Sequence, residues 1–416
     1  MKHYSYMNCK IGRPAFVVFL FLMLLLARDT LVTSVVLGFT ASQLLMLGGI
    51  CLVGLGFLFV NRGEWKSILT DKRMVLMAVS ACVLLVPMLV KQDWQMMYFS
   101  ILLCLLFAVF LTYFRSLEDV ARVYVILLTA LGVYSILATY ILRILPDRGI
   151  LSVPVHFNSK DVMFHNFGLA FVSDSYVKNR NFGIFWEPGV YQYFIILALF
   201  LNNYRITWRS QRTLWLINVL LSVTMLTTFA TGGVAELGLL VIVVFFEKKL
   251  YRDKRALWLA IGLVAAVILA LIVIVIQKGA IYWELYGMIV YKFSPEADSS
   301  SERVEAVMAN LSFFLQNPLV GKTISEVLHS VNNNTSSTLV MFAITGLFGG
   351  LVHVASWVAL VWKKERRLWA NLALLAPLLL SFNTQNLTAD VFFWLFPMMA
   401  LTETCVPLLE NRKKKV

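Results

Sequence analysis

Long apolar runs, separated by short polar segments, dominate the pattern of this chain. Runs such as 74–90, 256–276 and 339–362 are long enough to cross a hydrocarbon core about 30 Å thick as helices. The pattern therefore predicts a polytopic membrane protein. Twelve spans are expected, near residues 14–27, 35–60, 74–90, 96–114, 123–142, 190–203, 213–229, 232–246, 256–277, 336–362, 368–382 and 391–408.

Composition supports this fold class. Hydrophobic residues make up 60% of the 416 residues and charged residues only 14%, and the mean hydropathy is +0.78. A soluble domain of this size does not need so much apolar surface. We expect an all-α chain that forms a single integral membrane domain over residues 1–416. The net charge of +13 does not indicate nucleic-acid binding, because the basic residues lie in loops between the apolar runs.

The distribution of basic residues predicts the topology. With both termini in the cytoplasm, most of the 36 Lys and Arg residues fall on the cytoplasmic side, as the positive-inside rule requires. This arrangement leaves two long extracytoplasmic loops, at about residues 143–188 and 278–335. The other outer loops are short, so we expect the functional site in these two loops and in the span ends beneath them.

The first long loop ends in a stretch where an arginine, aromatic residues and a carboxylate precede an apolar run. Pro188 suits the first turn of a helix, because proline has no backbone N–H to donate. Glu187 would then lie at the helix N-terminus, where unpaired N–H groups and the helix dipole favour an anion. Two interpretations stay open: a ligand site, or an interfacial anchor with Trp186 in the aromatic belt and Arg180 solvated.

The second long loop contains a predicted amphipathic helix that starts at Ser301 and continues for about four turns. Its apolar positions recur at helical spacing, so one face is buried or apposed to the membrane. Arg303 lies in the first turn, where the helix dipole disfavours a cation. It either faces an anionic partner or pairs on the surface with Glu302 or Glu305.

Two arginines and one carboxylate on the outer face would suit diphosphate chemistry. The guanidinium group binds phosphate oxygens through paired hydrogen bonds and stays protonated. A carboxylate such as Glu187 can act as a general base toward a sugar hydroxyl. The spacing of the five cysteines and five histidines predicts no metal site, and the chain contains no nucleotide-binding fingerprint. We therefore expect neither a metal nor a cofactor.

Two ionisable residues fall inside predicted spans. Glu236 follows the Thr231-Gly232-Gly233 start of the eighth span, and a carboxylate there is either functional or paired, or else neutral and structural. His353 lies in the middle of its span and is interpreted as a hydrogen-bonded packing residue. A polar turn is expected at the outer end of the last two spans, containing Asn383, Gln385, Asn386 and Asp390.

Four stretches, taken in order, resemble the O-antigen polymerase and O-antigen ligase superfamily of bacterial surface-polysaccharide assembly. Arg180 to Pro188 resembles its arginine, glycine-phenylalanine and Glu-Pro motif before a span, and Thr231 to Gly233 resembles its Thr-Gly-Ser-Arg motif. Arg303 followed by Asn317 to Gly321 is similar to its arginine-to-Pro-Leu-x-Gly segment. Gly346 to Gly349 resembles its closing Gly-x-x-Gly. The resemblance covers roughly residues 120–365 and implies a GT-C-like membrane fold.

The sequence departs from that family at two positions. Thr335-Ser336 stands where the family has His-Asn, and Gly233-Val234 replaces Ser-Arg. Ligases depend on the histidine, so the resemblance favours a polymerase over a ligase. A transporter of lipid-linked sugars is the alternative from another class, although the outer loops are large and no internal repeat is evident. A scaffold subunit is a further possibility.

The resemblance implies a metal-independent, inverting glycosyl transfer on the outer face of the bacterial cytoplasmic (inner) membrane. The substrates would be glycans linked to polyprenyl diphosphate, and membrane lipids, a chain-length regulator and a flippase would be the partners. Arg180 and Arg303 would hold the diphosphate, and Glu187 would orient or deprotonate the attacking hydroxyl. The expected substrate-binding residues are Trp186, Tyr191, Glu302, His329, Asn333, Asn334 and Thr335.

Overall fold

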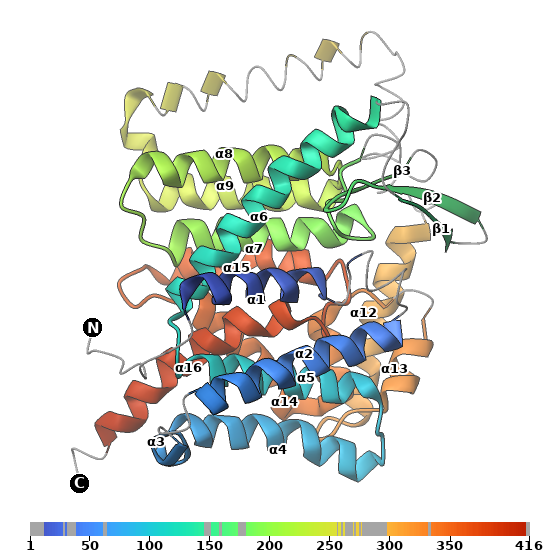
Figure 1. Cartoon of the computed structure of the whole chain (residues 1–416), viewed down its shortest axis with the longest axis vertical. Helices are drawn as coiled ribbons and strands as arrows, with labels where there is room; N and C mark the ends of the chain where they lie inside the picture. The colour runs from blue at the N-terminus through green and yellow to red at the C-terminus, as the bar shows by residue number, and fades with distance from the viewer. Residues whose placement is uncertain are drawn as a thin grey trace.

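The computed structural model describes residues 12–27, 30, 39–60, 65–144, 151–157, 160–173, 180–255, 298–331 and 334–412, with scattered positions between 257 and 276. These residues form fourteen α-helices, two 3₁₀ turns and one three-stranded sheet (Figure 1). The α-helices are α1 (Arg13–Leu25), α2 (Phe39–Val60), α3 (Trp65–Thr70), α4 (Arg73–Lys91), α5 (Met96–Leu111), α6 (Leu117–Tyr140), α7 (Pro188–Tyr204), α8 (Gln211–Thr227), α9 (Thr231–Glu247), α12 (Asp298–Gln316), α13 (Ile324–His329), α14 (Ser337–Val361), α15 (Leu368–Phe382) and α16 (Val391–Arg412). The strands are β1 (Leu151–Phe157), β2 (Lys160–Asn166) and β3 (Phe171–Ser173), and the 3₁₀ turns are η3 (Leu142–Ile144) and η4 (Leu250–Arg252).

Most of the helices coincide with the predicted spans. Each predicted span overlaps one of these helices except the ninth, residues 256–277, most of which lies outside the described residues. By length and composition α4, α6 and α14 can cross a membrane, and α1, α5, α15 and parts of α2 and α16 are shorter apolar helices. The chain is therefore mostly helical, with helices apolar enough to span a membrane.

The helices run roughly side by side, so the molecule has two ends (Figure 1). The strands and α13 lie at one end, called here the sheet end. The short helix α3 and the last turns of α16 lie at the other, called here the α3 end (Figure 1). Both segments predicted as long outer loops therefore contribute ordered elements to the same end of the molecule.

Buried charges tie the helices together at the α3 end. Arg205, which ends α7, donates from Nη2 to the backbone oxygen of Ala359 at 2.6 Å and from Nε to that of Leu360 at 2.8 Å. Burial lowers the pKa of Arg205 to about 10. Arg366 forms an ion pair of 3.0 Å with Glu247, the last residue of α9. These contacts fix the ends of α7 and α9 against the chain around α14 and α15.

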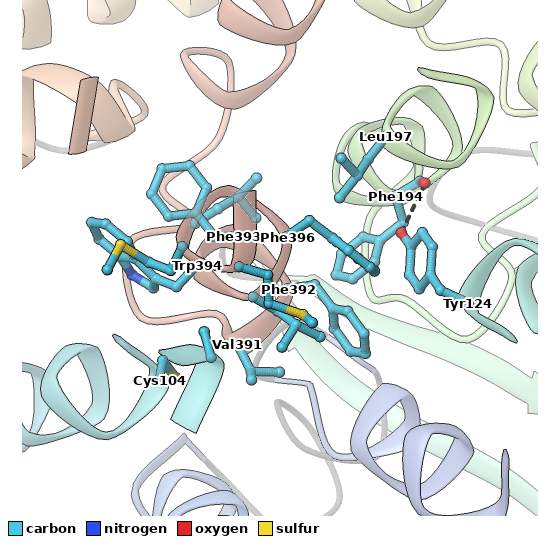
Figure 2. Close-up of a cluster of buried hydrophobic side chains, with 14 of the residues drawn as sticks. Cys104, Tyr124, Phe194, Leu197, Val391, Phe392, Phe393, Trp394 and Phe396 are labelled. Atoms are coloured by element: carbon cyan, nitrogen blue, oxygen red, sulfur yellow. Dashed lines mark hydrogen bonds between the residues drawn. The ribbon is translucent and has the colours of Figure 1, made fainter. Parts of the chain in front are cut away.

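The aromatic first half of α16 lies in the centre of the hydrophobic core (Figure 2). The rings of Phe392 and Phe396 lie 5.2 and 4.9 Å from the Tyr124 ring of α6, centroid to centroid. The Tyr124 hydroxyl donates to the backbone oxygen of Phe194 in α7 at 2.9 Å. Cys104 of α5 lies on another side of α16 (Figure 2). The core thus joins α5, α6 and α7 to one aromatic helix.

His353 is a packing residue, as the sequence indicated. It is only 1% exposed, and its ring is stacked on Phe393 with centroids 5.2 Å apart. Trp394 meets the same ring edge-on at 5.4 Å. Its Nε2 lies 3.4 Å from Thr338 Oγ1, so one ring nitrogen has a polar partner within this aromatic surround.

The first long loop contains an antiparallel sheet that the sequence analysis did not predict. Strand β1 pairs with β2 from Leu151–Asn166 to Phe157–Lys160, and β3 then pairs with β2. The sheet is joined to α6, because the Tyr134 hydroxyl donates to the backbone oxygen of Phe167. The all-α class therefore describes the membrane helices, and this small sheet is an addition to it.

Helix α14 breaks at Gly346, where φ is 69° and ψ is −162°. The segment after α12 packs against this break, and Pro318 accepts a backbone hydrogen bond from Leu347 at 2.7 Å. A Cβ on residue 346 would lie 2.3 Å from the backbone oxygen of Leu319. Gly321 also has a positive φ of 69°, and its Cβ would lie 2.4 Å from a backbone oxygen of α14. Two of the four family-like stretches thus contact each other, and they need glycine for backbone packing.

Lys91 stabilises the same junction. Its Nζ donates to the backbone oxygen of Lys322 at 2.8 Å, to that of Ile344 and to the Tyr98 hydroxyl. Tyr98 in turn donates to Ile344 at 2.8 Å. An ammonium group has three donors, and these contacts use all three. Lys91 therefore holds the second long loop against α14 instead of facing solvent.

Candidate functional site at the sheet end

Glu187 occupies the position that the sequence predicted. It is the N-cap residue of α7, with φ −139° and ψ 139°, and Pro188 opens the helix. Its side chain is half-buried and makes no capping hydrogen bond to the helix. Gln385, from the loop between α15 and α16, donates through Nε2 to Glu187 Oε2 at 3.2 Å. Gly189 permits this approach, because a Cβ there would lie 2.8 Å from the Gln385 nitrogen.

The turn that leads into α7 is held by Asn181. Its Nδ2 donates to Ser135 Oγ at 2.9 Å and to Thr227 Oγ1 at 3.0 Å, and its Oδ1 accepts from the Gly183 N–H at 2.9 Å. Asn181 itself is fully buried. The neighbouring Arg180 is half-buried. Because the Asn181 side chain is held by these hydrogen bonds, the backbone of Arg180 is fixed at the sheet end.

Tyr191 lies inside the protein and not on a sugar-binding surface. It is 1% exposed, its ring is stacked on Phe185 with centroids 5.2 Å apart, and its hydroxyl lies 3.4 Å from Ser135 Oγ. Gly183, with φ 57°, has no room for a side chain, because a Cβ would lie 2.8 Å from the Tyr191 ring. This corrects the expectation that Tyr191 binds substrate, since its ring supports the turn. Trp186 is half-buried and packs against the core.

The start of α9 faces α7 at Gln192. A Cβ on Gly232 or Gly233 would lie 3.0 Å from the Gln192 amide, so the two glycines let this side chain pack closely on α9. Gln192 Nε2 donates to Glu236 Oε1 at 3.3 Å and to Thr384 Oγ1 at 3.2 Å. Glu236, flagged by the sequence as anomalous, is fully buried. One amide therefore links a buried carboxyl group of α9 to the α15–α16 loop.

The α15–α16 loop also holds the start of α14. Asn383 Oδ1 accepts from Ser336 Oγ at 3.0 Å and from the Thr338 N–H at 3.1 Å. Ser337 Oγ donates to the backbone oxygen of Gln385 at 2.6 Å. From the sequence this loop was interpreted as a polar turn. The concentration of amide side chains at the end of a span was the one available signal that it belongs to a site. The sheet-end polar cluster, as we define it, consists of Glu187, Gln192, Glu236, Ser336, Ser337, Asn383, Thr384 and Gln385.

The second long loop reaches this region through two asparagines. Asn310 of α12 and Asn334 exchange amide hydrogen bonds of 2.8 and 3.0 Å. Thr335, next in the chain, is only 5% exposed, so it supports the start of α14 and does not offer a surface to substrate. His329 ends α13 at an exposed position. Asn333 lies outside the described residues.

Arg303 lies on the exposed side of α12. Among the described residues it forms no hydrogen bond or ion pair, so the surface pair with Glu302 or Glu305 considered from the sequence is not formed there. Glu302 is half-buried. Arg303 precedes Asn310 by about two helical turns, and Asn310 joins α12 to Asn334, just before the start of α14.

Within the described part of the chain, no three His, Cys, Asp or Glu side chains gather as a candidate metal site. Comparison of the chain with protein-family models, curated proteins and solved structures found no match.

Proposed function

We propose that the protein is a membrane glycosyltransferase that polymerises oligosaccharide repeat units carried on polyprenyl diphosphate. In this proposal the chain crosses the bacterial cytoplasmic membrane twelve times, both termini are cytoplasmic, and the sheet end faces outward. The apolar helices support a membrane location. The resemblance of four sequence stretches to the polysaccharide polymerase superfamily supports the reaction class.

The arrangement of Glu187 carries the proposal. The carboxylate stands at the N-terminus of α7, is oriented by Gln385 at 3.2 Å, and keeps partial exposure at the sheet end. An oriented and accessible carboxylate is what a general base toward a hydroxyl group requires. The loop that carries Gln385 is itself held by Gln192 of α7 and by Ser336 at the start of α14, so the orientation of Glu187 is a built feature of the fold.

The reaction joins a growing glycan to one lipid-linked repeat unit. A hydroxyl oxygen of the acceptor sugar attacks the anomeric carbon of the donor, and Glu187 accepts the hydroxyl proton. The bond from that carbon to the diphosphate oxygen breaks, and the electron pair leaves with the diphosphate. Attack opposite the leaving group inverts the anomeric configuration. Arg180 and Arg303 bind the diphosphate and stabilise its charge without a metal ion.

We assign contact with the sugars to Trp186, Glu302, His329 and Asn334, which are half-buried or exposed, and also to Asn333. We assign support of the site to Tyr191 and Thr335, which are buried. A flippase would deliver the lipid-linked units, and a chain-length regulator would act on the product.

A gel of surface polysaccharide from a deletion strain tests the proposal. Restoration by the wild-type gene of a ladder of long chains, replacing a product with one repeat unit, supports polymerisation. Long chains that accumulate on the carrier lipid in the deletion strain would indicate a ligase instead. Loss of all outward-facing repeat units would indicate a transporter. Either of the last two results would overturn the proposal.

A further inference from the structure

We propose that Glu236 holds a proton and, as a neutral acid, positions Glu187 through Gln192 and the loop 383–385. Glu236 is then a positioning residue for the proposed glycosyl transfer, so this inference rests on the proposed role of Glu187. Glu236 does not itself touch the substrate, because it is fully buried.

The surroundings of Glu236 contain no counter-charge among the described residues. Helices α7, α8 and α15 pack against α9. Helix α15 has no titratable residue, the single charged residue of α8 is Arg212 at the α3 end, and the titratable residues of α7 are tyrosines. Glu247 and η4 lie at the opposite end of α9. The remaining charge on the polar cluster is Glu187, which is also a carboxylate.

An ionised carboxylate in this position would be costly. Removing an unpaired charge from water costs several kcal/mol even after relaxation, and buried carboxyl groups avoid that cost by binding a proton. The neighbours of the Glu236 carboxyl group are neutral: the Gln192 amide donates to Oε1, and the Ser381 hydroxyl lies beside the group. A proton on the Glu236 carboxyl group therefore removes a negative charge that none of its described neighbours would neutralise.

The hydrogen-bond pattern also has room for one additional donor. Glu236 Oε2 and Gln192 Oε1 are both buried and have no partner of standard geometry within the described structure. A carboxylic acid pairs with a primary amide in two directions: the amide N–H donates to one acid oxygen, and the acid O–H donates to the amide oxygen. A proton on Oε2 supplies the second of these bonds. Without it, both buried oxygens are left without a donor in the described structure.

The acid–amide pair determines where the loop lies. Because Gln192 is fixed by Glu236, its Nε2 can also donate to Thr384 Oγ1 at 3.2 Å. Thr384 precedes Gln385, which orients Glu187 at 3.2 Å. Loss of the proton would remove the bond from the acid to the Gln192 oxygen, and the amide could then turn both N–H groups toward the carboxylate and release Thr384. The carboxylate of Glu187 would then lose its defined orientation.

Infrared difference spectroscopy tests the proton directly. Full-length protein purified in detergent at neutral pH should show the C=O stretch of a protonated carboxyl group, and the Glu236→Gln variant should lack it. A spectrum in which the wild type and Glu236→Gln do not differ in this region would overturn the inference. This readout does not depend on enzymatic activity, so it stands even if polymerisation is disproved.

Activity of three variants tests the positioning role. Glu236→Gln keeps the shape and the neutral hydrogen bonds, so it should retain polymerisation and lose the alkaline fall in its pH profile. Glu236→Asp keeps the ionisable group but draws it back from Gln192, and Glu236→Ala removes it; each should lower the rate about 10- to 100-fold. A higher polymerisation rate for Glu236→Asp than for Glu236→Gln would show that a charge at this position is needed and would overturn the inference.

Thr384→Val provides a second test with the carboxyl group intact. It removes the acceptor of Gln192 while keeping the side-chain shape, so the infrared band should persist while the rate falls. Wild-type rates in Thr384→Val would show that the loop contact does not position Glu187. Absence of polymerisation by the wild type, with the infrared band present, would disprove the proposed function and leave the protonated state of Glu236 established.

Discussion

Gln385 donates a hydrogen bond to the Glu187 carboxylate at 3.2 Å, although the two residues are 198 positions apart in the chain. The candidate site therefore combines the stretch around Glu187, near the middle of the chain, with Gln385, near its C-terminal end. It also gives the proposed base a defined orientation, because one of its oxygens is held.

Gln385→Ala should therefore lower the rate of polymerisation about tenfold and change the apparent affinity less, because orientation and not binding is lost. Glu187→Gln removes the base and should cost about 10²- to 10⁴-fold. Rates are measured with the purified enzyme and lipid-linked repeat units. Gln316→Ala, which removes an exposed amide that bonds within α12, is the matched control and should leave the rate unchanged.

Arg180→Ala and Arg303→Ala should shorten the surface polysaccharide, because each removes a guanidinium group proposed to stabilise the leaving diphosphate. Arg180→Lys should not restore full length, since a lysine cannot form the paired hydrogen bonds of arginine. Chain length is measured on a gel of surface polysaccharide. Arg209→Ala, an exposed arginine between α7 and α8, is the control, and full-length chains in both Arg180 and Arg303 variants would remove them from the site.

Gly346→Ala should destabilise the protein by about 2 kcal/mol or more, because alanine is strained at φ 69° and its Cβ would lie 2.3 Å from the Leu319 oxygen. Thermal unfolding in detergent measures the effect. Gly238→Ala in α9 is a matched control, since a Cβ there meets nothing within 4 Å. It should be neutral or stabilise by about 0.5–1 kcal/mol. Equal unfolding temperatures for Gly346→Ala and Gly238→Ala would contradict the proposed role of Gly346 in the helix break.

Lys91→Met should destabilise the protein by about 2 kcal/mol, because the backbone oxygens of Lys322 and Ile344 would lose a charged donor. Proteolysis within the second long loop should become faster as α12 and α13 detach from α14. Lys254→Met, at an exposed position, is the comparison and should leave both unfolding and proteolysis as in the wild type.

The cap of α13 predicts a pH dependence. Hydrogen bonds from the Thr323 side chain and backbone hold the pKa of Glu326 below its ordinary value. The ionised form is the stabilised one, so this contribution is present above the unfolded pKa and is lost as the pH falls through the lower folded pKa. Thr323→Ala should cost about 1 kcal/mol at neutral pH and reduce the acid sensitivity of α13 in hydrogen exchange. An unchanged exchange rate for α13 would contradict this account.

Local signals in the sequence were sufficient for most of the helices. Pro188 after Glu187 predicted the start of α7, and apolar run lengths predicted the positions of the other long apolar helices, because both depend on neighbouring residues. The six-residue helices α3 and α13 were not predicted. The sheet was not predicted, although its pairing is local: Phe157 lies opposite Lys160, and Asn166 opposite Phe171. The apolar residues at every second position of β1 (Leu151–Phe157) were the available signal for a strand.

The polar cluster could be predicted only in part, because its contacts join residues far apart in the chain. Glu187 and Glu236 were found because carboxylates beside or inside apolar runs are unusual. Gln385 and Asn383 were not, since an amide in a turn is ordinary until the fold brings it against Glu187 or Ser336. Tyr191 was misassigned because an aromatic residue near a span end can face sugar, lipid or core, and only the packing on Phe185 distinguishes these.

The most direct test of the central claim uses purified protein reconstituted in liposomes, together with the lipid-linked repeat unit isolated from the deletion strain. Wild-type protein should extend this single substrate into a ladder of longer lipid-linked chains without added metal or nucleotide, and Glu187→Gln protein should leave it unextended. A substrate that stays at one repeat unit with the wild type, or an equal ladder with Glu187→Gln, would contradict the assignment of a polymerase with Glu187 as its base.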